Sequence, residues 1–148
     1  IIEINDIPFD KIALELTESM NEEEFGHVQS VMRTLHEIGM KFYLDDFGTG
    51  NSSFWTLHNI NIDILKLDQS FIRGLNNGEK RIDYAIVESV GLMCNRIGCK
   101  TIAEGVENNE IWKMINKFEF TGLQGYLFSR PVDTASFEEL LEKYDMQA

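Results

Sequence analysis

The stretch FGHVQSVMRTLHEIGMKFYLDDFGTG, residues 25–50, contains the pattern that decides the fold. Its first part has the apolar spacing of one face of an amphipathic helix, at Phe25, Val28, Met32 and Leu35. Gly39 follows, at the place where a helix commonly ends in a residue with positive φ. Residues 41–44 are β-prone and run directly into Asp45-Asp46. The stretch therefore predicts a helix, a tight stop and a short strand that ends in two acids.

The same alternation continues along the chain. Three further segments predict amphipathic helices with one buried stripe, and Gly98 follows the first of them. Their apolar positions are Ile82, Ile86, Val90, Met93 and Ile97; Ile111, Met114, Ile115 and Phe118; and Phe137, Leu140, Leu141 and Tyr144. Short β-prone runs precede the helices, at 12–16, 41–44, 64–67 and 101–103, with a weaker run at 122–123. A shorter helix is expected over 53–58.

Strands that alternate with helices predict an α/β fold, with five βα units of parallel sheet. Two architectures fit this count. An open, doubly wound sheet of five units is complete at about 150 residues, whereas a TIM barrel of eight units takes about 250. A chain of 148 residues is either a whole open sheet or most of a barrel, and the spacing alone leaves both open.

The charge balance excludes several classes of partner. The chain has 13 Lys+Arg against 25 Asp+Glu, a formal net charge of −12, and no basic run. Duplex nucleic acid and anionic membranes both attract basic surfaces. No apolar run approaches the ~20 residues of a membrane span. Cys94 and Cys99 are too few for a disulfide framework, and we expect reduced, cytosolic thiols.

Polar or ionisable side chains follow every predicted strand. In either architecture the functional edge lies at the carboxyl ends of the strands. The side chains found there are Glu15 with Glu18, Asp45 with Asp46, Lys66 with Asp68, Glu104 with Glu107, and Gln124. Acids crowded at one edge raise each other's pKa values unless cations neutralise them, and Lys66 supplies one charge only. Hard divalent ions can supply the rest, and two of them about 4 Å apart would suit attack on a phosphoester.

Other short motifs in the sequence are weaker indications of function. Residues 46–48 spell the kinase DFG, but the glycine-rich loop, HRD and APE that accompany it in kinases are absent from this sequence. The three histidines, His27, His36 and His58, have no second histidine at ligand spacing, so zinc is not supported.

Taken in order, five motifs closely resemble the EAL-type phosphodiesterases, which hydrolyse cyclic di-GMP to a linear dinucleotide. The motifs are Glu15-Leu16-Thr17-Glu18; Asp45-Asp46-Phe47-Gly48-Thr49-Gly50 with Ser52-Ser53; Leu65-Lys66-Leu67-Asp68; Ala103-Glu104-Gly105-Val106-Glu107; and Gln124-Gly125-Tyr126 with Arg130-Pro131. The resemblance covers essentially the whole chain. It implies a partial TIM-like barrel whose mouth holds two Mg²⁺ or Mn²⁺ ions.

The resemblance also implies a role for each matching residue. Glu15, Asp45 and Asp46 would be metal ligands, with Asp45 bridging both ions. Lys66 would hold the attacking water, and Glu104 would be the general base, supported by Glu107. Gln124 would orient water and bind the nucleotide, and Glu18 would position the loop of residues 47–53.

The sequence departs from the family in its first part. The Glu-Ala-Leu signature, an Asn metal ligand and part of the substrate site belong upstream of Glu15, so residues 1–148 are interpreted as a truncated EAL domain without its first three units. The first metal site would then be incomplete, and we expect the isolated fragment to be inactive. Exposed barrel edges predict a homodimer or swapped oligomer.

The resemblance further implies cyclic di-GMP as the ligand and regulatory or diguanylate-cyclase-like domains upstream in the parent protein. The location is expected to be cytoplasmic, either free or as the cytoplasmic part of a membrane-attached protein. Two alternatives compete with the enzyme. One is a sensor that binds the dinucleotide without cleaving it. The other is a phospho-accepting domain of five βα units, but its lysine should follow the last strand, where this sequence has Gln124.

Overall fold

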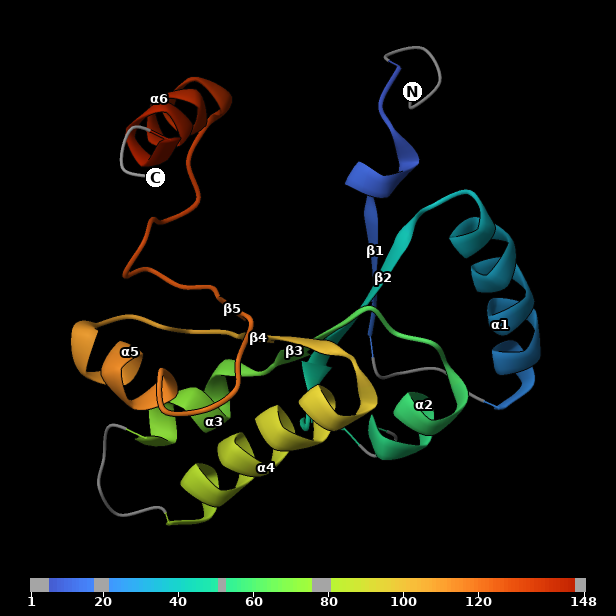
Figure 1. Cartoon of the computed structure of the whole chain (residues 1–148), viewed down its shortest axis with the longest axis horizontal. Helices are drawn as coiled ribbons and strands as arrows, with labels where there is room; N and C mark the ends of the chain where they lie inside the picture. Colours follow the sequence, from blue (N-terminus) through green and yellow to red (C-terminus); the bar gives the residue numbers. More distant parts are fainter. Residues whose placement is uncertain (1–5, 18–21, 51–52, 76–80, 146–148) are drawn as a thin grey trace.

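The computed structural model describes residues 6–17, 22–50, 53–75 and 81–145 (Figure 1). In chain order the elements are η2 (Phe9–Lys11), β1 (Ala13–Leu16), α1 (Glu22–Glu37), β2 (Lys41–Phe47), α2 (Ser53–Asn59), β3 (Ile64–Leu67), α3 (Gln69–Gly74), α4 (Arg81–Ile97), β4 (Lys100–Ala103), α5 (Asn109–Ile115), β5 (Gly122–Leu123) and α6 (Thr134–Asp145). The predicted strands and helices are all present, although β2 runs three residues beyond its predicted end and α5 ends before Phe118. The short helix α3 was not predicted.

The order of the strands decides between the two architectures. They form a 5-stranded sheet in the order β1-β2-β3-β4-β5, and every neighbouring pair is parallel. A doubly wound sheet reverses its strand order at a switch point, whereas a barrel adds each strand on the same side of the last. The sheet is therefore part of a TIM-like barrel, and the open doubly wound alternative is wrong.

The helices lie on the outside of this partial barrel. Right-handed crossovers that always advance in one direction place their helices on the same face of the sheet. In Figure 1, α1, α2, α4 and α5 follow one another around the sheet, while α6 stands apart at the end of an extended segment. Among the described residues, no helix combines the length and apolar character needed to cross a membrane.

The core fills the space between the sheet and the outer helices. Strands β2 and β3 contribute fully buried side chains, among them Leu44, Leu65 and Leu67, and the helices add Ile72 and Val87. Along β3, three consecutive residues are buried, as is usual for a central strand of a parallel sheet. One of the three is Lys66, so a lysine stands inside a strand that is otherwise apolar.

The buried face of α4 matches the predicted stripe only in part: Val90 is buried and Ile86 and Met93 pack against the core, but both ends of the stripe do not. Ile82 and Ile97 are 64% and 57% exposed, so they do not belong to the core. The buried positions are Asp83, Val87, Val90, Gly91 and Cys94. Small and polar residues occupy this face because α4 packs closely on its neighbours: a Cβ atom at Gly91 would lie 3.3 Å from the Phe120 ring. A count of large apolar side chains cannot detect such a face.

The apolar stripe of α6 is also not buried as predicted. Phe137 and Leu141 are both about half exposed. Together with Leu140 and the segment 124–132 they line an apolar cavity of about 500 Å³. The side chain of Tyr144, the last predicted stripe position, lies outside the described set.

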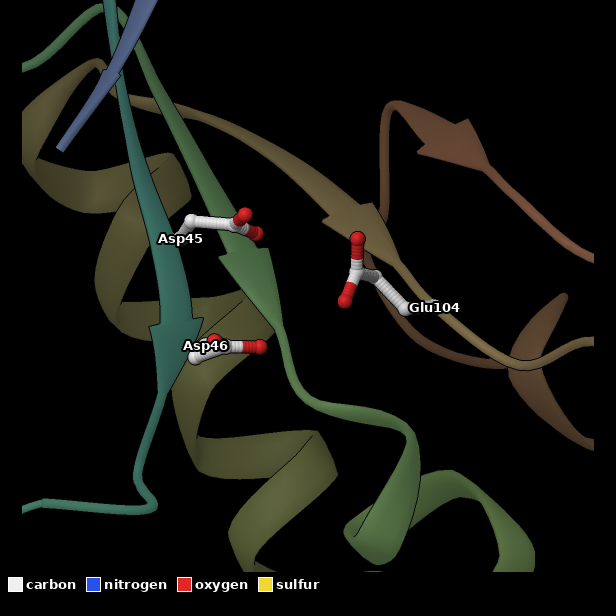
Figure 2. Close-up of side chains that lie close together, drawn as sticks. All are labelled: Asp45, Asp46 and Glu104. Atoms are coloured by element: carbon white, nitrogen blue, oxygen red, sulfur yellow. The ribbon is translucent and has the colours of Figure 1, made fainter. Parts of the chain in front are cut away.

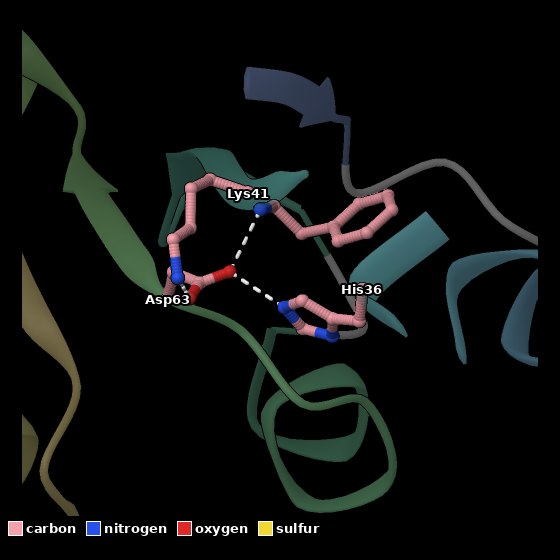
Figure 3. A network of polar contacts seen from close by, with 4 residues as sticks. His36, Lys41 and Asp63 are labelled. Carbon is pink, nitrogen blue, oxygen red and sulfur yellow. Dashed lines mark hydrogen bonds and ion pairs between the residues drawn. The ribbon is translucent and has the colours of Figure 1, made fainter. Parts of the chain in front are cut away.

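A polar network ties the elements together at the amino-terminal end of the strands (Figure 3). Asp63, which precedes β3, accepts hydrogen bonds from the backbone N–H of Phe42 at 2.9 Å and from Lys41 Nζ at 3.1 Å. His36 Nε2, at the end of α1, lies 2.8 Å from the same carboxylate. These bonds lower the pKa of Asp63 although its burial acts in the opposite direction. His36 is thus a partner of Asp63.

Candidate active site

A bulge in β2 brings two adjacent carboxylates to one edge of the sheet. In the pairing of β2 with β3, Asp45 and Asp46 together oppose the single residue Lys66. Asp46 has a φ of 52°, in the left-handed region that aspartate tolerates better than most residues. Consecutive side chains of a regular strand point to opposite faces. The bulge removes this alternation, so both aspartates stand at the carboxyl end of the strands.

Lys66 connects the acids from three other strands. Its Nζ lies 2.8 Å from Asp45 Oδ1, 2.8 Å from Glu104 Oε1 and 3.0 Å from Glu15 Oε1. Glu15 belongs to β1 and Glu104 follows β4, so residues far apart in the sequence meet around one ammonium group. The predicted meeting of acids at the strand ends is confirmed for these three positions.

Three carboxylates form a compact oxygen cluster beside this lysine. Figure 2 shows Asp45, Asp46 and Glu104 with their carboxylates turned toward a common space. One oxygen from each lies within 4.8 Å of the others. Glu15 is not part of this cluster but contacts the neighbouring Lys66. The structure thus groups Glu104 with the aspartates more closely than it groups Glu15 with them.

The electrostatics of the site follow from burial and from this crowding. Burial alone would lower the pKa of Lys66, but its hydrogen bonds to Asp45, Glu104 and Glu15 outweigh that effect and raise the pKa well above the ordinary 10.5. Burial raises the pKa of Glu104, while Lys66 opposes the rise and Asp45 and Asp46 add to it. The pKa of Asp46 is raised by burial first and then by the Asp45 carboxylate. The acids therefore favour a positive neighbour beyond the single lysine.

The residues present fit a hard divalent cation. Mg²⁺ and Mn²⁺ take oxygen ligands, and the cluster offers three carboxylates from two strand ends. Burial is the largest cause of the raised pKa values of Asp46 and Glu104, and the neighbouring carboxylates add to it. Asp45, Asp46 and Glu104 are the residues that would hold such an ion, with Lys66 next to it.

Gln124 and Glu107 line the neighbouring part of the rim. Both border a cavity of about 280 Å³ that also reaches Glu104 and Tyr126. Glu107 is partly exposed and pairs with Arg73 of α3, whose Nη2 lies 3.0 Å from Glu107 Oε1. The sequence pattern did not predict a role for Arg73, because α3 has only 6 residues and no apolar periodicity that would identify it as a helix.

Two other acids from the strand ends have separate outcomes. Asp68 accepts a hydrogen bond from the backbone N–H of Ser70 at 2.9 Å, so it caps α3. It does not belong to the oxygen cluster. Glu18 and part of the loop 47–53 that it was expected to position lie outside the described residues.

Comparison with known proteins identifies the family. The family model described as "EAL domain" matches residues 1–131. The chain belongs to the EAL domain family. Over 140 residues, 95% of the chain, this EAL domain is 36% identical to the cyclic di-GMP phosphodiesterase PdeB of Shewanella oneidensis. The match spans 16% of that relative, so the chain corresponds to a small part of a much longer protein.

Solved structures share the fold of this chain. The EAL domain of Mycobacterium smegmatis DcpA superposes with a TM-score of 0.86 at 29% identity, over 96% of this chain and 63% of that one. BlrP1 of Klebsiella pneumoniae, in a complex with manganese and cyclic di-GMP, superposes with a TM-score of 0.80 at 32% identity, over 88% of this chain and 33% of that one. The chain therefore shares the fold of these structures along most of its own length and spans only part of theirs.

Proposed function

We propose that this EAL domain is the carboxyl-terminal part of a metal-dependent phosphodiesterase domain that hydrolyses cyclic di-GMP to linear pGpG. One observation carries the proposal: a buried lysine joins acids from three other strands at the edge where parallel barrels place their active sites. PdeB, a relative with 36% identity, is named for this activity. The substrate is accordingly a cyclic dinucleotide with two phosphodiester bonds.

A bound Mg²⁺ or Mn²⁺ would polarise the phosphate and lower the pKa of a bound water. The protein's own groups do the rest. Lys66 holds a positive charge beside the phosphate and fixes the orientation of Asp45 and Glu104. Glu104, whose carboxylate shares the space of the two aspartates, accepts the proton of the attacking water. Gln124, on the rim of the neighbouring cavity, orients the nucleotide.

The water oxygen attacks phosphorus, one P–O bond of the ring breaks, and the freed sugar hydroxyl takes up a proton. Two features support a lower activity for these residues on their own. The solved DcpA domain is covered to 63% only, and Glu15 stands outside the oxygen cluster. We expect the isolated 148-residue chain to bind metal and to turn over little or no substrate.

The experiment compares two site variants and one control variant, and the activity of each is measured by chromatographic separation of cyclic di-GMP from pGpG. In the natural protein that carries this chain, Lys66→Ala and Asp45→Asn should each lower kcat by about 10²-fold or more. Glu138→Gln, an exposed carboxylate on α6, serves as the matched control and should leave kcat unchanged. Normal rates in both site variants would overturn the assignment.

Binding of cyclic di-GMP without any hydrolysis, in the natural protein and with Mn²⁺ present, would instead support the sensor alternative. The metal site has its own test. Titration of the isolated chain with Mn²⁺, followed by electron paramagnetic resonance, should show binding that Asp45→Asn weakens at least tenfold. Equal affinity in the variant would remove Asp45 from the metal site.

The EAL domain is further proposed to self-associate and to act in the cytoplasm next to regulatory domains of its parent protein. Two features support association: in the described sheet β1 and β5 each pair on one side only, and the Phe137 and Leu141 stripe of α6 is exposed. Light scattering of the chain should give a dimer, and Leu141→Asp should shift it toward monomer. A stable monomer of the unchanged chain would contradict self-association.

A further inference from the structure

The turn between α4 and β4 brings the chain's two cysteines together. The backbone N–H of Cys99 donates to the carbonyl of Cys94 at 2.9 Å, and that of Gly98 donates to the carbonyl of Asn95 at 3.2 Å. These two bonds define the Schellman motif, with Gly98 at a φ of 75°. The motif brings the side chains of the residues at its two ends into contact. Here those residues are Cys94 and Cys99.

The end of α1 shows what the same turn usually holds. The N–H of Met40 donates to the carbonyl of Leu35 at 3.1 Å, and Gly39 has a φ of 99°. The residues at the two ends of that turn, Leu35 and Met40, are apolar and carry no reactive group. The turn after α4 has the same hydrogen bonds but replaces the apolar pair with two thiols.

The two thiols differ in their access to solvent. Cys94 is 0% exposed, whereas Cys99 is 8% exposed and lines an open cavity of about 600 Å³ between α2 and the end of α4. Met93 and His58 border the same cavity. A small neutral oxidant can therefore approach Cys99, with Cys94 directly behind it.

A hydrogen bond between the two thiols changes both of their pKa values. The hydrogen bond with Cys99 and burial raise the pKa of Cys94. The hydrogen bond from the Cys94 thiol lowers the pKa of Cys99, and the backbone N–H of Leu65 adds to this effect against the cost of burial. The two thiols thus interact directly, and a thiolate is the reactive form of cysteine.

We propose that Cys94 and Cys99 form a redox-reactive dithiol, a peroxide-modification site on the opposite end of the sheet from the acidic cluster. The Cys99 thiolate attacks one oxygen of hydrogen peroxide, the O–O bond breaks, and Cys99 becomes a sulfenic acid while hydroxide leaves and is protonated to water. The Cys94 sulfur then attacks the Cys99 sulfur, the S–O bond breaks, and a second water leaves. Peroxide is reduced to two waters, and the two thiols are oxidised to one disulfide.

The test is a peptide map of the folded chain after exposure to hydrogen peroxide. Free thiols are blocked with N-ethylmaleimide in denaturant, and the chain is digested with trypsin without reduction. Trypsin cuts after Arg96, so a Cys94–Cys99 disulfide joins the peptides 82–96 and 97–100. The expected result is this cross-linked pair, two hydrogen masses lighter than its separate peptides. Oxidation of Met93 adds an oxygen and is distinguished by mass.

Two variants check the order of the steps. In Cys94→Ala, Cys99 has no partner thiol, so its sulfenic acid should accumulate and be trapped by dimedone. In Cys99→Ala, the fully buried Cys94 should react at least tenfold more slowly with peroxide. Circular dichroism establishes that each variant is folded, and the unfolded chain in urea is the control in which both cysteines react alike.

Three results would overturn the proposal: no intramolecular cross-link in the folded chain, a cross-link between two chains in its place, or equal reactivity of the single cysteines in the folded variants.

Discussion

The active edge depends on an unusual backbone conformation at one residue. Asp46 occupies the left-handed region, and this conformation lets it stand beside Asp45 on the same edge of β2. For most residues that conformation costs about 1–3 kcal/mol, whereas aspartate and asparagine adopt it more readily. An aspartate at position 46 therefore tolerates the positive φ and also supplies a carboxylate to the oxygen cluster.

The two roles of Asp46 can be separated by substitution. Asp46→Asn keeps a side chain that tolerates positive φ and should unfold near the wild-type temperature, yet bind Mn²⁺ at least tenfold more weakly. Asp46→Val should weaken metal binding too and in addition lower the free energy of unfolding by about 2 kcal/mol, because a β-branched residue is strained there. Thermal unfolding in chelator compares the two. Equal stability of the Asn and Val variants would show that the backbone is not strained at this position.

Lys66 makes a pH-dependent contribution to stability. Its pKa in the folded chain lies above its ordinary value of 10.5 because three carboxylates hold its proton. The contribution is therefore complete below pH 10.5 and is lost as the pH rises through the folded pKa. Removing one partner of a buried ion cluster costs about 3 kcal/mol, so Lys66→Met should destabilise the chain by that order at pH 7.

Urea unfolding of the metal-free protein between pH 7 and 11.5 tests this. The stability difference between the wild-type chain and Lys66→Met should stay constant up to about pH 10 and then shrink. A difference that grows with pH would contradict the assignment of Lys66 as the charged centre of the site.

Among the helices, α4 shows how packing determines which face of a helix is buried. Its largest aliphatic side chains do not all face the core, since Ile82 and Ile97 point to solvent while Val87 and Cys94 are fully buried. Gly91 belongs to the buried face because Phe120 packs against it. Close packing has therefore selected small side chains for the interior side of this helix.

A matched pair of substitutions measures this difference in burial. Val87→Ala removes buried methyl groups and should lower the free energy of unfolding by about 2 kcal/mol. Ile82→Ala removes more apolar carbon, yet it should change stability by about 0.5 kcal/mol or less because the side chain is exposed. Urea denaturation of both variants gives the comparison. A larger loss for Ile82→Ala would mean that this end of the predicted stripe faces the core.

At the scale of the whole molecule, the two ends of the sheet have different tasks. The carboxyl ends carry the acids and Lys66, whereas the amino-terminal end is closed by the network of Asp63 with His36 and Lys41 (Figure 3). In TIM barrels the face at the carboxyl ends of the strands carries the active site, and the face at their amino-terminal ends stabilises the fold. Asp63 joins the end of α1 to two strands, so it stabilises the molecule and stays away from the reaction.

Asp63→Asn should therefore destabilise the chain by about 2 kcal/mol at pH 7 and leave Mn²⁺ binding unchanged. The folded pKa of Asp63 is depressed below 3.8, so its contribution is present above pH 3.8 and is lost as the pH falls through the folded pKa. The difference between the wild type and the variant should thus vanish in acid. Glu138→Gln is the control for a single lost carboxylate, and a pH-independent effect of Asp63→Asn would contradict this role.

The order of strands and helices, and the acids that follow the strands, could be predicted without the structure, because strand period, helix period and glycine stops are local properties of the chain. Gly39 and Gly98 end their helices with positive φ as predicted, and the motifs identified the family correctly. Roles that rest on the resemblance, such as general base for Glu104, stay predictions.

The remaining features could not be predicted from local patterns in the sequence. The strand order excluded the doubly wound sheet, packing left both ends of the predicted α4 stripe exposed, and the bulge placed Asp45 and Asp46 on one edge. The contacts of Lys66 and the approach of Cys94 to Cys99 belong to the same group. These features depend on which segments become neighbours in space. That choice is made by the free energy of the whole folded chain, and no local pattern in the sequence records it.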